Sequence, residues 1–233
     1  MIRINNLKKT FDSNVAVDIQ SLSIKQGEVV GIVGNNGAGK TTLFRLILDL
    51  YKADTGVVLS KGDDVAKTED WKWYTGAFID SGFLIEFLTP EEYFYFIGKC
   101  HNLSKADVDN RLVDFEKFMA GEILGKKKYI HAFSMGNKQK IGIIGAMIIQ
   151  PDILILDEPF NYLDPSSQIE MMRLITLYNG SYGTTMLLSS HNLEHITEVS
   201  SRIVLMEKGR VLEDMKDHSS NVISSLKEYF ECQ

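Results

Sequence analysis

The stretch Gly34-Asn-Asn-Gly-Ala-Gly-Lys40-Thr41 matches the pattern G-x-x-x-x-G-K-[ST] and lies between an apolar run, residues 29–33, and a segment of helical spacing. Glycines let backbone N–H groups turn inward, and the N-terminus of the following helix adds positive potential toward a phosphate. Lys40 supplies a charge for the β- and γ-phosphates, and the Thr41 hydroxyl is a ligand for Mg²⁺. The alternative is a glycine turn without function. The strand–loop–helix setting favours a nucleotide site, lined by Gly34, Asn35, Asn36, Gly37, Ala38, Gly39, Lys40, Thr41 and Thr42.

An acid pair ends a second apolar run. Residues 153–156 are Ile-Leu-Ile-Leu, and Asp157-Glu158 follows directly. In phosphoryl transfer the first acid of such a pair holds the metal, and Glu158 is then placed to orient or deprotonate an attacking water. Acids at a strand end can also serve solubility alone, but their combination with the Lys40 loop favours a catalytic role.

A histidine follows a third strand pattern, residues 185–189. His191 is expected at the carboxyl end of this strand, the edge where open parallel sheets bind ligands. A neutral imidazole could hydrogen-bond the γ-phosphate or hold the water. Viewed alone, a packed or surface histidine is the better interpretation.

Strand and helix patterns alternate along most of the chain, which predicts a mostly parallel sheet with helices on both faces. The middle differs, because Thr89-Pro90-Glu91-Glu92 has a capping pattern and strand signals nearly vanish after it. We expect one domain over residues 1–233 with a helical subdomain inserted at about 89–150. Strands are expected at 2–4, 21–24, 29–33, 57–59, 77–79, 153–156, 185–189, 203–206 and 211–212, and helices at 43–50, 93–99, 104–119, 136–149, 165–178 and around Val222, Leu226 and Phe230.

Composition limits the function classes. The 233 residues carry 25 Lys plus Arg against 31 Asp plus Glu, a net charge of −6, which is not the footprint of a dedicated nucleic-acid binder. Cys100 and Cys232 have neither zinc spacing nor a disulfide framework, and two structural thiols suit a reducing cytoplasm. The N-terminus lacks the apolar core of a signal peptide. The most apolar run, residues 141–149, falls well short of the ~20 residues that span a bilayer, so we expect no membrane crossing.

A further segment narrows the class. Phe133-Ser134-Met-Gly136-Asn-Lys-Gln-Lys140 opens a helix shortly before the acid-bearing strand. The order of the Lys40 loop, this segment, Asp157-Glu158, Leu163-Asp164 and His191 resembles the ATP-binding subunits of ABC transporters, over nearly the whole chain. The resemblance implies a P-loop NTPase (RecA-like) core with a mostly parallel sheet, an antiparallel β edge and an inserted helical subdomain.

The resemblance also implies a dimer. In this family two subunits sandwich two ATP molecules head to tail, so that Ser134 and Gly136 would contact the γ-phosphate bound by the other subunit. A helix N-terminus carrying Ser and Gly is an anion site. Asp164 matches the family's inter-subunit communication loop and would also cap the helix that begins at Pro165. Phe11 aligns with the aromatic that stacks on adenine, the alternative being an ordinary core phenylalanine.

The sequence departs from the family's pattern at several positions. Asp80 falls near the usual Gln that contacts Mg²⁺ and the catalytic water, and its side chain is short and charged. Phe133, Met135 and Asn137 replace the commoner Leu, Gly and Gln. An acid near position 80 and such a signature are similar to the bacitracin- and lantibiotic-type exporter branch.

The resemblance implies an ATP-hydrolysing motor subunit that uses ATP and Mg²⁺ and energises a separate integral membrane subunit, with export favoured over import. It would pair as a homodimer or heterodimer, bind no nucleic acid, and lie in the cytoplasm, peripheral on the inner face of the cell membrane. Phe83 and Phe87 are the preferred contacts to the membrane subunit, while most other aromatics of this region fill a core. The alternatives are a soluble ABC-type ATPase and a non-hydrolysing regulatory ATP sensor. The presence of Glu158 and His191 argues against the sensor, while Asp80 leaves it open.

Overall fold

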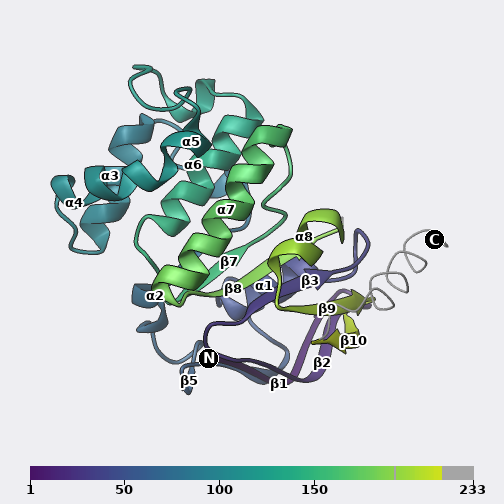
Figure 1. Ribbon diagram of the computed structural model, residues 1–233. Coiled ribbons are helices and arrows are strands. Elements are labelled where there is room, and N and C mark those ends of the chain that lie inside the picture. Colours follow the sequence, from purple (N-terminus) through teal and green to yellow (C-terminus); the bar gives the residue numbers. More distant parts are fainter. Residues whose placement is uncertain (192, 217–233) are drawn as a thin grey trace. The chain divides into compact units, whose positions relative to one another are not determined.

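The computed structural model describes residues 1–191 and 193–216 (Figure 1). The chain divides into two compact units. The first holds residues 1–72 and the described residues from 185 onward, and the second holds residues 73–184. Both combine helices with parallel strands, which confirms the predicted α/β class. The assignment of one domain with an insertion at about 89–150 stays a prediction.

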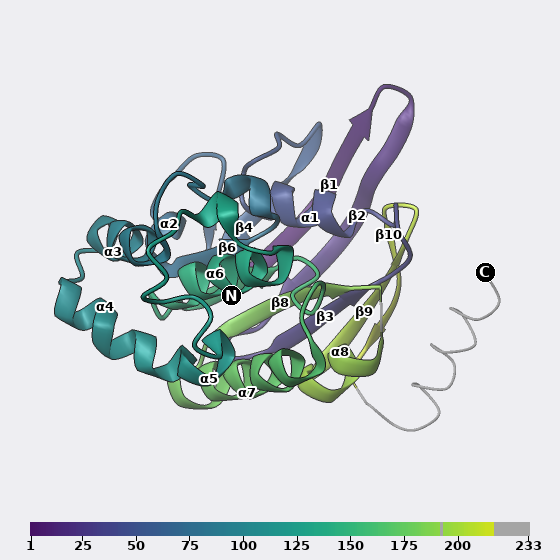
Figure 2. The same cartoon turned by 90° about the horizontal axis from the view of Figure 1, so that it is seen from above.

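The first unit contains the predicted antiparallel β edge. This sheet has the order β2-β1-β4-β5, with β1 at Ile2–Phe11, β2 at Asn14–Ile24, β4 at Thr55–Ser60 and β5 at Asp63–Asp64. Figure 2 shows β1 and β2 as one long hairpin. We expected only short strands at 2–4 and 21–24. The hairpin continues through polar residues because β1 pairs with β2 along its whole length, to Phe11 opposite Asn14.

A second set of strands in the first unit carries the core. β3 (Val29–Val33) lies between β8 (Thr185–Ser190) and β9 (Arg202–Glu207), parallel to both, and β10 (Arg210–Met215) is antiparallel to β9. Every residue of β3 and β8 is buried, as expected for strands covered on both faces. α1 (Lys40–Ile47) follows β3. It ends before Leu50, which is exposed, so the helix lies three residues earlier than the expected 43–50.

Helix α8 (Leu193–Val199) was not predicted. It packs against β3 at Gly31, where a Cβ would lie 2.8 Å from Ile196 Cγ2 and 2.9 Å from Ser200 Oγ. The close approach therefore requires glycine in an otherwise β-branched strand.

The second unit contains a parallel pair of strands and most of the helices. β6 (Thr75–Phe78) pairs with β7 (Ile153–Leu156). The helices are α3 (Pro90–Cys100), α4 (Lys105–Leu112), α5 (Glu116–Met119), α6 (Met135–Met147) and α7 (Pro165–Tyr182), with 3₁₀ turns at Ser81–Phe83, Val113–Phe115 and Ile130–Ala132. A short helix, α2 (Trp71–Tyr74), lies where the two units join in sequence. The predicted capping box forms, with Thr89 and Glu92 bonded to each other's backbone N–H.

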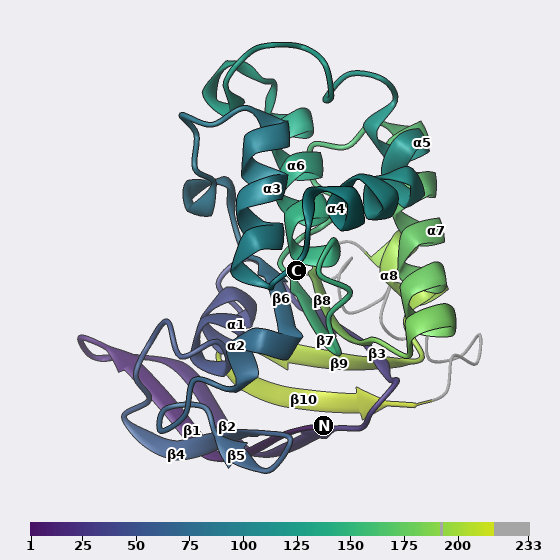
Figure 3. The same cartoon turned by 90° about the vertical axis from the view of Figure 1, so that its left-hand side faces the viewer.

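Helix α6 forms the centre of the second unit. α3 and α5 both contact it (Figure 3). A Cβ on Gly142 would overlap the ring of Phe78, and one on Gly145 would lie 2.8 Å from Tyr93 Cε1. The two glycines therefore let a strand and a neighbouring helix approach the α6 backbone.

Two other expectations for this unit were wrong in detail. The single helix expected at 104–119 is interrupted at Val113–Phe115, where the carbonyl of Asp114 accepts a hydrogen bond from Arg173 Nη2 at 2.9 Å. α7 continues past residue 178 to Tyr182 and ends at Gly183 in the left-handed conformation. The helix expected around Val222, Leu226 and Phe230 lies outside the described residues. Within those residues, every helix is too short or too polar to cross a membrane.

Candidate functional site

The predicted phosphate loop leads directly from β3 into α1. A Cβ on Gly34 would collide with the carbonyl of Met206 and lie 2.9 Å from Ala38 Cβ. Gly39, with φ of 101°, precedes the first residue of α1, and a Cβ there would collide with the carbonyl of Ala16. Packing and backbone conformation thus require glycine at both ends of the loop. Glycine also lets a backbone approach a ligand closely.

Lys40 is the first residue of α1 and only 6% exposed. Its Nζ donates to the carbonyl of Gly34 at 2.7 Å and to that of Asn35 at 3.3 Å. These two carbonyls hold the ammonium group against the loop. Phosphate oxygens are stronger acceptors for an ammonium group than carbonyls are, so the loop fits the anion that the sequence predicted. Thr41 and Thr42 lie in the first turn of α1, both partly exposed.

His191 comes directly after β8 and is exposed. Ser190, the last residue of β8, pairs with Val33, the last residue of β3. Since these strands are parallel, His191 and Gly34 leave the same edge of the sheet from neighbouring strands. The predicted position of His191 at a carboxyl-terminal strand end is confirmed.

Phe11 ends β1 and is 42% exposed, so the alternative of a core residue is wrong. Its ring packs edge-to-face on Tyr51, with centroids 5.4 Å apart, and Lys9 Nζ lies 5.3 Å from its centroid. Tyr51 is in turn fixed by Arg45 of α1, whose Nη1 donates to the Tyr51 hydroxyl at 2.8 Å. Sequence reasoning missed Tyr51 and Arg45. Stacking of Phe11 on adenine stays a prediction.

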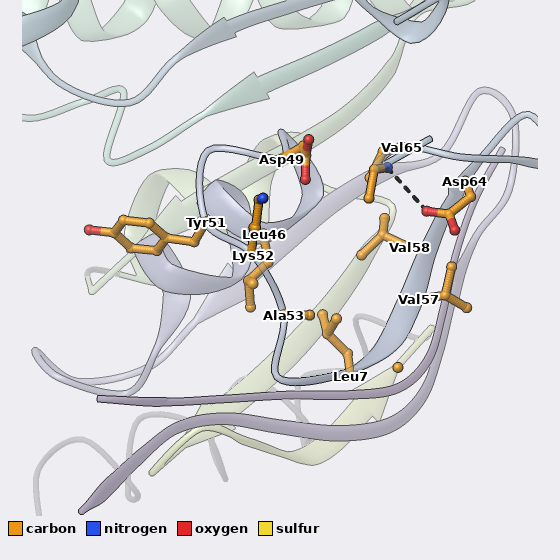
Figure 4. A pocket seen from close by; sticks show the side chains of 12 residues that line it. Leu7, Leu46, Asp49, Tyr51, Lys52, Ala53, Val57, Val58, Asp64 and Val65 are labelled. Carbon is orange, nitrogen blue, oxygen red and sulfur yellow. Dashed lines mark hydrogen bonds between the residues drawn. The ribbon is translucent and has the colours of Figure 1, made fainter. Parts of the chain in front are cut away.

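A cavity of about 320 Å³ opens beside this cluster, between β1, β4 and the segment after α1 (Figure 4). Leu7, Leu46 and Val58 form its apolar side, while Asp64 accepts a hydrogen bond from Ala66 N at 3.1 Å. Its lining contains no residue of the phosphate loop. We therefore do not assign it to the nucleotide.

The three carboxylates that the sequence predicted for this site follow the ends of the β6–β7 pair. Phe78 pairs with Leu156, and Asp157 N donates to the carbonyl of Phe78 at 2.9 Å. Asp80 and Glu158, each two residues beyond the last pair of the two strands, therefore leave the same edge. Asp157 is buried and Glu158 is half-buried, with a backbone φ of 48°.

The side chain of Asp80 is engaged by its own loop. It caps the 3₁₀ turn Ser81–Phe83, and its Oδ1 accepts a hydrogen bond from Gly82 N at 2.7 Å. One carboxylate oxygen is thus used by the turn. Its role toward a metal stays a prediction.

Ser134 is exposed and caps α6, where its Oγ accepts from Asn137 N at 3.3 Å; Gly136 lies in the first turn of the same helix. Asp164 caps α7, as predicted. It accepts from Ser166 Oγ at 2.6 Å and from Ser167 N at 3.0 Å and Oγ at 2.6 Å. The hydrogen bond from the Ser166 hydroxyl, followed by those from Ser167, holds the pKa of Asp164 well below its usual value.

The structure thus brings the predicted residues together in two groups. In the first unit the phosphate loop and His191 follow the carboxyl ends of β3 and β8, and in the second unit Asp80, Asp157 and Glu158 follow the carboxyl ends of β6 and β7. Sequence reasoning missed Gln139 and Lys140, which are buried polar residues of α6. The available signal was their polarity at the start of the apolar run that fills the helix.

Solved structures resemble this arrangement over almost the whole chain. The structure of an ATP-binding subunit of an ABC transporter has a TM-score of 0.85 at 25% identity, covering 97% of this chain and 93% of that one. A dimeric post-hydrolysis state of the ATP-binding cassette MJ0796, bound to ADP and Pi, has a TM-score of 0.82 at 23% identity, covering 93% and 98%. The fold is therefore that of an ATP-binding cassette, with a P-loop NTPase core.

The sequence comparisons agree with this class. A family model described as ABC transporter matches residues 17–161. The uncharacterized ABC transporter ATP-binding protein YcbN of Bacillus subtilis (strain 168) is 33% identical over 220 residues, covering 92% of this chain and 69% of the relative. The chain belongs to the ABC transporter ATP-binding family and is an ATPase domain of that family, which binds ATP.

Two further relatives are named for the transport of different compounds. The bacitracin transport ATP-binding protein BcrA of Bacillus licheniformis is 31% identical, covering 94% of this chain and 71% of the relative. The methionine import ATP-binding protein MetN of Rhizobium johnstonii is 30% identical, covering 92% of this chain and 60% of the relative. The chain thus spans roughly two thirds of the length of such relatives.

Proposed function

We propose that this chain is the ATP-hydrolysing motor subunit of an ABC transporter and energises transport through a separate integral membrane subunit. The observation that carries the proposal is the phosphate loop between β3 and α1, with its buried Lys40 and its glycines at both ends. Membership of the ABC transporter family supports the same function.

The proposed reaction is attack of water on the γ-phosphorus of ATP. Glu158 takes a proton from the water, whose oxygen forms a bond to the γ-phosphorus, while the bond to the β–γ bridging oxygen breaks and its electron pair leaves with ADP. Phosphate is the second product, and Glu158 later releases the proton to solvent. Lys40 neutralises charge on the β- and γ-phosphates, and His191 hydrogen-bonds the γ-phosphate or the water.

Mg²⁺ fits the donors that we assign to it. Thr41, Asp157 and Asp80 offer hydroxyl and carboxylate oxygens, which are the ligands that this hard cation prefers. Bound with ATP, the ion neutralises charge that develops on the phosphate oxygens. We assign the metal to these three side chains by their chemistry.

The γ-phosphate contacts are completed, in our proposal, by a second ATP-binding subunit. Ser134 is exposed at the tip of α6, and Gly136 follows it in the first helical turn, so this helix N-terminus is accessible to an anion. A second copy, or a related subunit, would present its ATP here. Asp164 would belong to the loop through which the two subunits communicate.

The membrane subunit is proposed to dock on the second unit. Phe83 and Phe87 are 54% and 73% exposed, and large exposed aromatics are favoured anchors of protein interfaces. Docking would hold the chain on the cytoplasmic face of the membrane. We propose export as the direction, supported by Asp80 and by the signature Phe133-Ser-Met-Gly-Asn137, which are similar to the bacitracin- and lantibiotic-type branch.

The test is steady-state ATP hydrolysis by the purified full chain. Glu158→Gln should lower kcat by about 10²–10⁴-fold while ATP still binds, because only the general base is removed. It should also accumulate an ATP-dependent dimer in size-exclusion chromatography. Glu122→Gln, which changes an exposed glutamate of the same unit, is the matched control. Unchanged hydrolysis in Glu158→Gln would contradict the assignment of the base, and the absence of any wild-type hydrolysis would contradict the motor function.

A further inference from the structure

The loop that carries the proposed general base has an unusual backbone. It connects β7 to α7 and includes Glu158 and Tyr162, whose φ values are 48° and 63°. Non-glycine residues adopt this left-handed region rarely, and they persist there only where neighbouring groups hold the backbone. The position of the Glu158 carboxylate therefore depends on what holds its peptide.

The first two turns of α6 supply these contacts. Gln139 Nε2 donates to the carbonyl of Glu158 at 3.1 Å. Gly136 faces the backbone of Tyr162, where a Cβ would lie 2.6 Å from the carbonyl oxygen. Lys140 Nζ lies 3.9 Å from Asp164 Oδ2. Helix α6 thus contacts the loop at Glu158, at Tyr162 and at Asp164.

Burial makes the Gln139 contact significant. Gln139 is 7% exposed, and the Glu158 carbonyl accepts a second hydrogen bond, from Asn161 N at 3.1 Å. A buried amide that loses its partner cannot replace it with water. The bond fixes the peptide that follows Glu158, and hence the direction in which the side chain leaves the backbone.

We infer that Gln139 is a positioning residue for the catalytic base: it holds the Glu158 peptide so that the carboxylate faces the attacking water. The inference rests on the proposed function, since it needs Glu158 as the base. It adds a link within one subunit, because Gln139 and Ser134 belong to the same helix. When Ser134 engages the nucleotide of the other subunit, any displacement of α6 reaches the base through this bond.

The opposing interpretation is that Gln139 is a buried polar residue that merely needs a partner. The same loop provides a comparison. Gln168 of α7 donates through Nε2 to the carbonyl of Phe160 at 3.4 Å, and is also partly buried. Gln168 holds the loop by the same kind of bond, but at Phe160 and not at the proposed general base, Glu158. A purely structural role predicts similar effects from both glutamines.

The experiment compares Gln139→Met with Gln168→Met in the purified full chain. Methionine keeps the length of the side chain and removes the donor. For Gln139→Met we expect kcat to fall about tenfold or more while KM for ATP stays within about twofold, since the residue acts on the chemical step. Gln168→Met should remain within about threefold of wild type.

A double-mutant cycle separates positioning from folding. Gln139→Met should cause no further loss in a Glu158→Gln background, because its effect passes through the carboxylate. If Gln139→Met does not fold, Gln139→Glu replaces it, since glutamate has the same length and no donor when ionised. Equal losses from the two methionine variants, additivity with Glu158→Gln, or a wild-type kcat in Gln139→Met would each overturn the inference. An active wild type with an inactive Glu158→Gln would then leave the proposed function standing, whereas an inactive wild type would remove both.

Discussion

Val33 and Ser190 are paired across two adjacent parallel strands and are the last residues of those strands. Gly34 and His191 therefore begin the two segments that leave the sheet at one edge. In parallel sheets this carboxyl edge is where ligands bind. From the sequence alone His191 could not be distinguished from a surface residue. The strand pairing shows that it follows the strand next to the one that leads into the phosphate loop.

The first prediction follows from that pairing. His191→Ala should lower kcat by about a hundredfold, the scale of a lost group that holds a proton or a hydrogen bond in the transition state, while ATP affinity changes little. Hydrolysis rates and ATP titrations measure the two effects. His195→Ala, which removes a histidine from α8 in the same unit, is the control. Equal kcat values for the two variants would contradict a role of His191 at the γ-phosphate.

The second prediction concerns the exposed ring of Phe11. Phe11→Ala in a Glu158→Gln background should weaken ATP binding about tenfold, because base–aromatic stacking contributes about 1–3 kcal/mol. Phe11→Tyr should bind as tightly as the parent. Tyr51→Leu should cause a smaller loss, since it removes the edge-to-face support but not the stacking ring. Calorimetric titration with ATP tests all three.

Phe96→Ala, which removes an exposed aromatic ring from the second unit, is the control for this series. It should leave ATP affinity unchanged. A Phe11→Ala protein that binds ATP as tightly as its parent would show that the base does not stack on this ring.

The sequence predicts those structural features whose residues all lie within one short segment of the chain. The phosphate loop and β7 are short continuous motifs, and both lie where the sequence places them. The capping box at Thr89 and the cap at Asp164 were also predictable, because each depends on residues within one helical turn. Local rules of hydrogen bonding settle such features without tertiary context.

Features that depend on distant segments were not predictable. The hydrogen bond between Gln139 and Glu158 joins α6 to a loop that follows another strand. The helix expected at 104–119 is interrupted before α5, where Arg173 of α7 donates a hydrogen bond to the Asp114 carbonyl. No sequence pattern within 104–119 indicates this contact. The long β1–β2 hairpin carries polar residues that local patterning assigns to a turn, and pairing overrides that preference.

The third prediction separates two roles of Asp164 in stability. Asp164→Asn keeps an N-cap but loses the charge that faces Lys140, whereas Asp164→Ala loses both. The difference between Asn and Ala should be about 1 kcal/mol in the free energy of unfolding, the usual value of a cap. The difference between Asp and Asn should be below about 1 kcal/mol, because the carboxylate is largely exposed. Urea unfolding at neutral pH measures both, and identical stabilities for Asn and Ala would exclude a capping contribution.

The fourth prediction concerns the buried guanidinium of Arg202. It donates to both oxygens of Asp214 at 2.6 Å, to Glu28 at 3.1 Å and to the carbonyl of Ser23 at 2.8 Å. Arg202→Met leaves two carboxylates without this donor and should lower the free energy of unfolding by about 3–5 kcal/mol. Arg210→Met, which breaks only an exposed pair with Asp18, should cost less than about 1 kcal/mol.

The pH dependence of the Arg202 effect gives a sharper test. The hydrogen bonds from Arg202 hold the pKa of Asp214 below its usual value. A carboxyl whose pKa is lowered by folding stabilises the native state above its ordinary pKa of about 3.9, and this contribution is lost as the pH falls through the lowered value. The stability difference between wild type and Arg202→Met should therefore be larger at about pH 7 than at about pH 3. A difference that is the same at both pH values would show that packing of the arginine side chain, and not its bond to Asp214, accounts for the loss.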